Sequence, residues 1–180
     1  MAVRDVLRMG DPFLLRRASV VTELNSAELD ALIEDMLDTM RACDGAGLAA
    51  PQIGVDKRVV IFAVDSNPRY PDAETVPLTV LVNPEITPAG EERDLAWEGC
   101  LSVPGMRGLV PRYTSIRYTG TDHKGNRIDR TVSGFHARVV QHECDHLDGI
   151  LYPQRITDMR YFGFIEELFA EGSIANPAKA

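Results

Sequence analysis

The sequence predicts an α+β fold in which short, mostly antiparallel strands pack around a central helix. Two segments, residues 25–40 and 134–147, repeat apolar side chains at helical spacing, and short runs rich in β-branched residues lie between them. We expect one domain over residues 1–170, because a chain of 180 residues fits one core of ordinary size. Residues 171–180 lack periodicity and are predicted to form a disordered tail.

The composition and charge exclude several classes of function. The 19 Lys and Arg residues stand against 27 Asp and Glu residues, and the resulting charge of −8 disfavours a broad electrostatic grip on nucleic acid. No stretch approaches the roughly 20 apolar residues of a membrane span. Three cysteines at irregular spacing indicate a reducing compartment. We therefore expect neither membrane insertion nor sequence-specific binding of nucleic acid.

The first helix has a recognisable start. Asn25 or Ser26 can cap it, and Glu28 lies where a capping box would place it. Its apolar stripe extends to Met40 and indicates a side that faces the core. The glycines and alanines of residues 45–52 then exclude a strong helix and allow close approach of another chain.

Short strands are predicted in the middle of the chain. Residues 59–64 and 78–82 are β-branched runs, and residues 67–77 between them are expected to form a surface loop. Residues 115–119 and 127–132 flank a polar, glycine-containing turn, and this pattern predicts a β-hairpin.

The second helical segment, which Gly149 caps at its C-terminal end, carries the chemistry. His142 and His146 belong to a His-Glu-x-x-His motif, whose i, i+4 spacing brings both imidazoles to one face, where they can bind one metal ion. Glu143 lies beside them and can act on water at that ion. Cys144 projects about 200° around the helix from His142, because each residue advances a helix by about 100°, and is expected to be a buried apolar group.

A catalytic metal ion needs a third protein ligand and an open position for water. Glu166, on a last helix predicted over residues 158–170, has a spacing that resembles thermolysin-like zinc proteases. Cys100 is another candidate, in a segment that is expected to face the metal-bearing helix as a strand or turn. Cys43 would close a Cys2His2 centre and make the metal purely structural. The residues by themselves leave these alternatives open.

Three segments together resemble a known family. The three segments are Gly45-Ala46-Gly47-Leu48-Ala49-Ala50-Pro51-Gln52, Glu98-Gly99-Cys100-Leu101-Ser102 and Gln141-His142-Glu143-Cys144-Asp145-His146. In order and spacing, they closely resemble the signature motifs of peptide deformylase. The resemblance implies a metal bound by Cys100, His142 and His146. It also implies three groups that act on substrate: Glu143 as general acid/base, and Gln52 with the backbone N–H of Leu101 as stabilisers of the oxyanion.

The resemblance further implies an activity, a cofactor and partners. Members of the family remove the formyl group from the N-terminal formyl-methionine of newly made polypeptides and release formate. We expect one divalent metal ion per chain, Fe(II) in the cell, with Zn(II) or other divalent ions accepted. The partners would be N-formyl-Met peptides and nascent chains, with transient contact to the ribosome, in the bacterial cytoplasm.

The resemblance also implies where substrate binds. Contacts are expected from Gly45, Gly47, Glu98, Gly99, Phe135 and Val139. The small residues suit an extended peptide that adds main-chain hydrogen bonds, and Phe135 and Val139 would wall an apolar pocket for the methionine side chain. Arg138 departs from the aliphatic residue common in many bacterial members and is similar to the branch that includes organellar forms. Glu98 and Arg107 match positions that pair near the site in the family.

Overall fold

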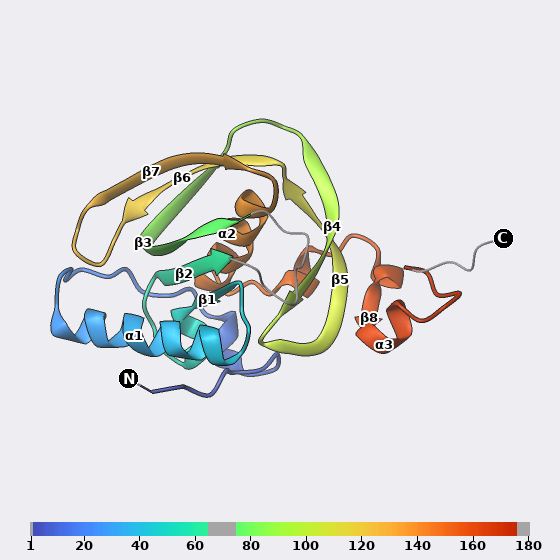
Figure 1. Cartoon of the computed structure of the whole chain (residues 1–180), viewed down its shortest axis with the longest axis horizontal. Helices are drawn as coiled ribbons and strands as arrows, with labels where there is room; N and C mark the ends of the chain where they lie inside the picture. The colour runs from blue at the N-terminus through green and yellow to red at the C-terminus, as the bar shows by residue number, and fades with distance from the viewer. Residues whose placement is uncertain (1, 65–74, 176–180) are drawn as a thin grey trace.

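Two antiparallel sheets make up the framework of the computed structural model, which describes residues 2–64 and 75–175. The five-stranded sheet has the order β1-β2-β3-β6-β7, and the three-stranded sheet has the order β4-β5-β8 (Figure 1). The strands are β1 (Gly47–Ala49), β2 (Val59–Val64), β3 (Val76–Pro88), β4 (Arg93–Cys100), β5 (Val103–Tyr113), β6 (Ser115–Thr121), β7 (Arg127–Ser133) and β8 (Phe162–Phe164). The predicted α+β class is confirmed.

The helix α2 (Gly134–Leu147) lies inside the curve of the five-stranded sheet (Figure 1). Val60 and Phe62 of β2 point toward α2 and share a buried cluster with its Val140 and Leu147. The alternate residues of β2 point the other way, toward the helix α1 (Ala27–Ala42). A strand that is covered on both faces reads as an unbroken apolar run, which explains the sequence Val-Val-Ile-Phe-Ala-Val.

The start of α1 differs from the prediction in one detail. Ser26 is the cap, and its Oγ accepts a hydrogen bond from Leu29 N at 3.3 Å. With Ser26 as the cap, the third helical residue is Leu29 and Glu28 is the second. The predicted capping box with Glu28 is therefore wrong, because its acidic side chain stands one position too early.

The middle of the chain follows the prediction closely. The strand at residues 59–64 has the expected bounds, and β6 and β7 pair as the expected hairpin. β3 is longer than predicted, so Val76 and Pro77, assigned to a loop, belong to a strand. The rest of that predicted loop lies almost wholly within residues 65–74, outside the described residues. α2 has the predicted bounds, and Gly149 follows its C-cap with a φ of +72°.

The three-stranded sheet holds a long hairpin that the sequence pattern did not predict. β4 and β5 pair along most of their length, and the register shifts between Glu98 and Cys100. Leu101 and Ser102 form the turn between the strands. Cys100 therefore lies at the irregular end of a strand, consistent with the predicted strand or turn that faces α2.

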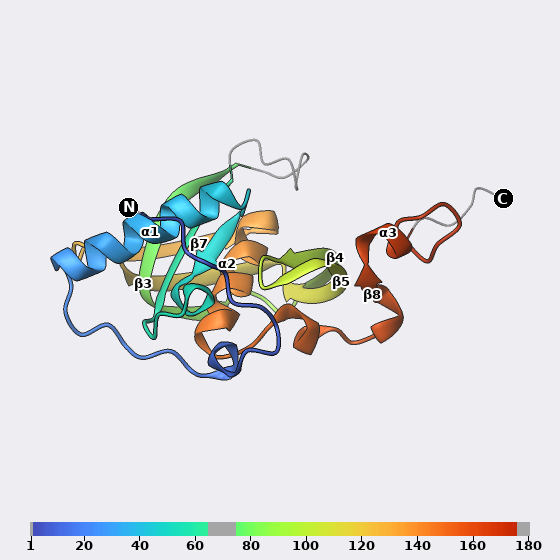
Figure 2. The ribbon, with the colours of Figure 1, turned by 90° about the horizontal axis from the view of Figure 1, so that it is seen from below.

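The predicted last helix over residues 158–170 is wrong. This stretch forms a 3₁₀ turn (Met159–Tyr161), the strand β8 and a four-residue helix α3 (Ile165–Leu168). β8 pairs with the edge of β5 and so satisfies backbone groups that a helix would satisfy internally. Both ribbon views show β8 and α3 at one end of the molecule (Figures 1 and 2). Predicted disorder over residues 171–180 stays a prediction, because residues 176–180 lie outside the described part.

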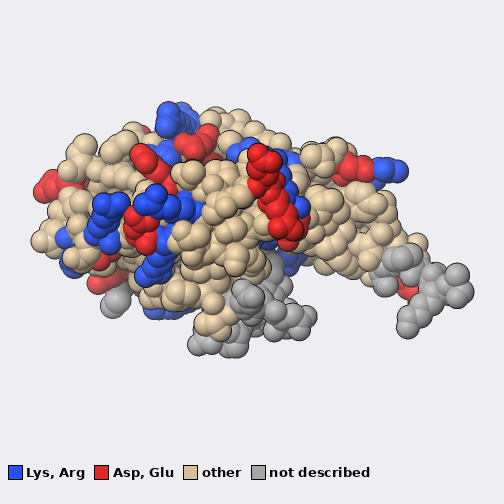
Figure 3. Space-filling view, turned by 90° about the horizontal axis from the view of Figure 1, so that it is seen from above, with Lys and Arg blue, Asp and Glu red and all other residues tan. Residues whose placement is uncertain are grey.

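Other short elements and surface properties complete the description. Further 3₁₀ turns are formed by Pro12–Leu15, Ala50–Ile53 and Tyr152–Arg155. No helix in the described part of the chain has the length and apolar character that crossing a membrane requires. Acidic and basic side chains are interspersed on the face shown in Figure 3.

Candidate metal centre and active site

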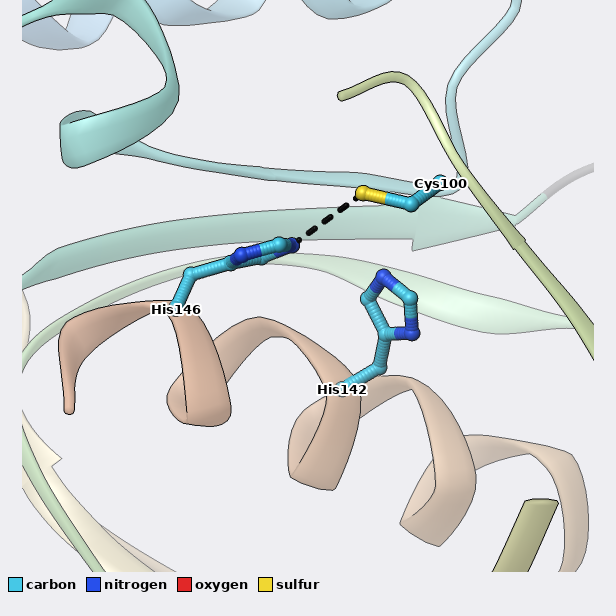
Figure 4. A group of neighbouring side chains, drawn as sticks. All are labelled: Cys100, His142 and His146. Atoms are coloured by element: carbon cyan, nitrogen blue, oxygen red, sulfur yellow. Dashed lines mark hydrogen bonds between the residues drawn. The ribbon is translucent and has the colours of Figure 1, made fainter. Parts of the chain in front are cut away.

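Two elements that are distant in the sequence bring three metal-ligating side chains together. α2 supplies His142 and His146 from successive turns, and the end of β4 supplies Cys100 (Figure 4). The ligand atoms of all three residues lie within 4.8 Å of one another, and Cys100 Sγ is 3.3 Å from His146 Nε2. Within the described residues this is the one group of three or more such side chains with that geometry.

The environment of Cys100 favours the thiolate, which is the form that binds metals. Burial by itself would raise the thiol pKa, but the adjacent His146 and His142 hold it well below its ordinary value. The backbone N–H of Ser102 also donates to Sγ at 3.4 Å. One thiolate and two imidazoles are donors that suit Zn(II) or Fe(II), and three protein ligands leave a position open for water. The donor set therefore fits a catalytic metal ion.

Glu98 orients the first histidine. Its Oε2 lies 2.9 Å from His142 Nδ1, which leaves the other ring nitrogen available for a metal. Arg112 donates to both carboxylate oxygens at 2.9 Å, and Arg138 donates to Oε1 at 2.8 Å. Glu98 is buried, and although burial opposes its charge, the contacts with Arg112 and His142 lower its pKa. The carboxylate is thus held ionised and immobile behind the histidine.

Glu143 lies on the open side of the site. Burial raises the pKa of Glu143 to about 7, so the carboxyl can both accept and release a proton near neutral pH. Its Oε2 is buried and has no hydrogen-bond partner among the described residues. Gly47 lies against this carboxylate so closely that a Cβ on the glycine would overlap it. An unpaired buried oxygen beside a ligand cluster is placed to bind a water molecule or a polar group of a substrate.

Gln52 connects the first motif to the metal ligands. Its Oε1 accepts from Ala49 N at 2.9 Å, and its Nε2 donates to Ser102 Oγ at 3.1 Å and toward Cys100 Sγ at 3.4 Å. The amide is therefore fixed in position beside the third ligand. Leu101, in the turn that follows Cys100, lies against Gly45 on the same side.

An open pocket lies over these groups. Except for His146, every residue that the sequence predicts for the site lines it. These are Gly45, Gly47, Gln52, Glu98, Gly99, Cys100, Leu101, Phe135, Val139, His142 and Glu143. The prediction did not include Trp97, and it gave Arg112 no role; no motif at these two positions signals a part in the site. Ala46 belongs to the first motif but was not singled out as a site residue.

Known proteins resemble this chain along nearly its whole length. Residues 3–161 match the family described as Polypeptide deformylase. Peptide deformylase 1 of Nitrosomonas europaea is 63% identical over 174 residues, which cover 97% of this chain and 99% of the relative. The chain belongs to the polypeptide deformylase family. Peptide deformylase 2 of Ralstonia nicotianae is also 63% identical, over 94% of this chain and 96% of the relative.

Solved deformylase structures share the fold. The Met-Ala-Ser-bound class I type b peptide deformylase from Acinetobacter baumannii matches with a TM-score of 0.83 and 44% identity, covering 86% of this chain and 99% of that one. The Thermotoga maritima enzyme matches with a TM-score of 0.78 and 34% identity, covering 88% of this chain and 100% of that one. As a deformylase, this protein is a metal-dependent hydrolase that removes the formyl group from the N-terminus of newly made polypeptides.

The competing ligand assignments fail in the deformylase structure. Glu166 is exposed on α3, at the far end of the molecule, and does not join the ligand group (Figure 2). Cys43 lies outside that group as well, so a closed Cys2His2 centre is not formed. Cys144 is buried, and burial raises the pKa of its thiol, in agreement with a packing role.

The family resemblance implies that Glu98 pairs with Arg107, and the structure of this deformylase shows which arginines form ion pairs with its carboxylate. The carboxylate forms ion pairs with Arg112 and Arg138. Arg107 lies over Gly99, where a Cβ would be 3.1 Å from the Arg107 Nε atom. Two of the three arginines near the site therefore act from behind His142, while Arg107 flanks the segment that carries Cys100.

Proposed function

We propose that Cys100, His142 and His146 bind one divalent metal ion, which is Fe(II) in the cell and is replaceable by Zn(II) or another divalent ion. The thiolate character of Cys100 and the Glu98 contact to His142 Nδ1 support this assignment. The single observation that carries it is the convergence of the three ligand atoms within 4.8 Å beside a buried, unpaired glutamate oxygen. When bound, the metal supplies Lewis acidity toward the formyl oxygen and lowers the pKa of water.

Glu143 is the general acid/base of the proposed reaction. Its carboxylate takes a proton from the water that attacks the formyl carbon, and it then gives this proton to the departing amine nitrogen. A pKa of about 7 suits both steps, because the group is present in both protonation states near neutral pH. The products are formate and a free N-terminal amine.

Gln52 and the backbone N–H of Leu101 stabilise the negative charge that develops on the formyl oxygen. Gln52 is oriented by Ala49 N and Ser102 Oγ, and its second Nε2 hydrogen, which lies 3.4 Å (N to S) from Cys100 Sγ, is the one that turns to the formyl oxygen. Removing one such donor costs about 2.7–4 kcal/mol of transition-state stabilisation in a well-studied protease. Leu101 follows Cys100 directly, which keeps its N–H next to the ligand.

The substrate enters as an extended peptide with its first side chain in the pocket. β1 is an edge strand of the five-stranded sheet, so Gly45 and Gly47 border backbone groups that a peptide can pair with. Phe135 and Val139 line the pocket from α2 and suit a methionine side chain. Glu98 and Gly99 line its opposite wall. The related Acinetobacter structure with bound Met-Ala-Ser supports a peptide in this site.

The natural partners are N-formyl-Met nascent chains in the bacterial cytoplasm, with transient contact to the ribosome. Recognition through main-chain hydrogen bonds and one side chain suits a substrate class of many different sequences. The named relatives above are bacterial deformylases, which supports the same setting for this chain.

Formate release tests the proposed site. Anaerobically purified protein, loaded with Fe(II) or Zn(II), is given an N-formyl-Met dipeptide, and formate and bound metal are measured together. We expect rapid release by the Fe(II) form, loss of metal and activity in Cys100→Ala, and loss of activity with metal retained in Glu143→Gln. Cys43→Ala and Glu166→Gln are matched controls outside the site and should behave as wild type.

Three outcomes would contradict parts of the proposal. Unchanged formate release in Glu143→Gln would remove Glu143 from the reaction. If no formate is released although each chain binds one metal ion, the metal has a structural role only. Release by the Zn(II) form that exceeds the Fe(II) form would contradict the choice of iron.

A further inference from the structure

A buried arginine forms part of the pocket wall, although nothing in the proposed chemistry uses its charge. Arg138 lies on α2 one turn before His142, is only 6% exposed, and lines the pocket together with Phe135 and Val139. Burying a guanidinium is costly unless its donors are satisfied. A packing role alone would need only an aliphatic side chain, so the contacts of the charged end require an explanation.

The guanidinium of Arg138 holds α2 against the three-stranded sheet at four points. Nη1 donates to Glu98 Oε1 at 2.8 Å and to Val110 O at 2.9 Å. Nη2 donates to Asp94 Oδ1 at 2.6 Å and to Asp94 O at 3.2 Å. Asp94 and Glu98 belong to β4 and Val110 to β5, so one side chain of the helix ties both strands of the hairpin.

The two walls of the pocket belong to the two parts that Arg138 connects. Trp97, Glu98 and Gly99 form the wall on β4, whereas Phe135 and Val139 form the wall on α2. The buried apolar residues of α2 cluster with the five-stranded sheet, and those of β4 and β5 form a separate cluster. Tyr113 of β5 packs against the first cluster, but it pairs with Arg93 at the start of β4 and not with the pocket wall. Apolar packing alone therefore does not fix the spacing between the walls.

A second ionic contact ties the sheet to α2 farther along the helix. Arg112 on β5 pairs with Asp145, seven residues after Arg138, or about 10 Å along the helix axis. Gln141 adds hydrogen bonds to the backbone of Tyr113 on the same side. Glu98 on β4 also contacts His142 of α2 directly, with Oε2 2.9 Å from Nδ1. Among these ties, Arg138 is the one that both lines the pocket and reaches β4 and β5 together.

We propose that Arg138 is a specificity-determining residue, whose bridge to Asp94 and Glu98 sets the width of the pocket for the first side chain of the peptide. The inference rests on the proposed function, since it concerns the same pocket. With the bridge in place, the walls on β4 and α2 are held at one separation, and an unbranched side chain such as methionine fits between them. Without it, the walls can separate and the pocket admits bulkier side chains.

Arg138→Met tests the bridge, because the variant keeps an unbranched apolar side chain of similar length and removes the guanidinium. Asp94→Ala removes the exposed end of the bridge without touching Glu98; the Asp94 side chain is 56% exposed, so this change is mild for folding. Arg138→Lys retains the charge but not the forked geometry. Arg117→Met is the matched control, because it breaks an exposed ion pair between Arg117 on β6 and Asp129 on β7.

The measurements are kcat/KM for formyl-Met-Ala and formyl-Phe-Ala, and the affinity for the unformylated product Met-Ala by calorimetry. One methylene in an apolar pocket changes discrimination by about 10–200-fold, so a change in wall spacing is measurable. We expect the Met/Phe ratio to fall about tenfold in Arg138→Met, through a higher KM for the Met substrate, and product affinity to weaken in parallel. Asp94→Ala should shift both in the same direction, Arg138→Lys should recover part of the ratio, and Arg117→Met should match wild type.

Each result decides the proposal. An active wild type with an unchanged Met/Phe ratio and product affinity in both Arg138→Met and Asp94→Ala would overturn it. A loss of thermal stability with selectivity retained would assign Arg138 a structural role only, which also overturns it. If Arg138→Met does not fold, Asp94→Ala and Arg138→Lys give the decision. An inactive wild type would instead refute the proposed function, which keeps the two failures distinguishable.

Discussion

The carboxylate of Glu143 occupies the space that any side chain on Gly47 would need. Gly47 begins the edge strand β1, and a Cβ built on it would overlap Oε1, Cδ and Cγ of the glutamate. The glycine of the first motif and the glutamate of the third therefore form one unit, although 96 positions separate them. A backbone without a side chain lets the proposed acid/base lie directly beside the strand where a peptide would pair.

Gly47→Ala should displace Glu143 and lower kcat/KM by about 10²-fold, because a shift of about 1 Å in a catalytic group has that effect. The metal ligands are not touched, so bound metal should stay at the wild-type level. Formate release and metal content measured on the same sample check this. Gly90→Ala is the control, since its Cβ would meet nothing within 4 Å, and equal activity in the two variants would refute the steric argument.

Glu98→Gln should weaken both folding and metal binding. The change leaves Arg112 and Arg138 without their buried carboxylate, and breaking a buried ion pair costs about 3–5 kcal/mol of unfolding free energy. Loss of the charged acceptor at His142 Nδ1 should reduce metal affinity about 10–100-fold. Urea unfolding and metal competition with a chelator measure the two effects. Asp129→Asn, on an exposed pair, should cost less than about 1 kcal/mol.

The same carboxylate predicts a stability change in acid. The pKa of Glu98 is lowered in the folded protein from an ordinary value of 4.5. Above that value the ionised carboxylate stabilises the fold, and as the pH falls below it the unfolded chain takes up a proton that the folded protein resists. The difference in unfolding free energy between wild type and Glu98→Gln should therefore shrink from pH 5 downward. A difference that grows in this range would contradict the assigned direction of the pKa.

Gly149→Ala should destabilise the protein without changing the ligand set. Gly149 has a φ of +72°, and a Cβ there would overlap the backbone carbonyl of Leu15. Positive φ alone costs about 1–3 kcal/mol for other residues, and the overlap adds to this cost. Gly105→Ala isolates the first contribution, because Gly105 has a positive φ of +75° within β5 but open space around it. Thermal unfolding should show a larger loss for Gly149→Ala; equal losses would mean that the contact with Leu15 is tolerated.

Local patterns predicted much of the fold, and the family resemblance of three short motifs implied nearly all of the pocket. The helical repeat placed α2 at its observed bounds, and the i, i+4 spacing put His142 and His146 on one face. The β-branched run gave β2 its observed ends. Patterns failed at residues 162–164, because their partner strand β5 is distant in the sequence. They also failed at residues 103–113, because this segment contains two prolines and still forms a strand that pairs with β4.

The sequence by itself determined the chemistry of the centre, because the types of the ligands and the spacing within α2 are local properties of the chain. The tertiary structure decided which candidate side chain lies beside the two histidines. Cys100 reaches His146 through the end of β4, while Glu166 is directed away on α3. The tertiary structure also places Glu98 in contact with Arg112, Arg138 and His142. It places the Glu143 carboxylate where a side chain on Gly47 would lie. Contacts between distant segments depend on how sheets and helices pack, and no periodicity within one segment encodes that packing.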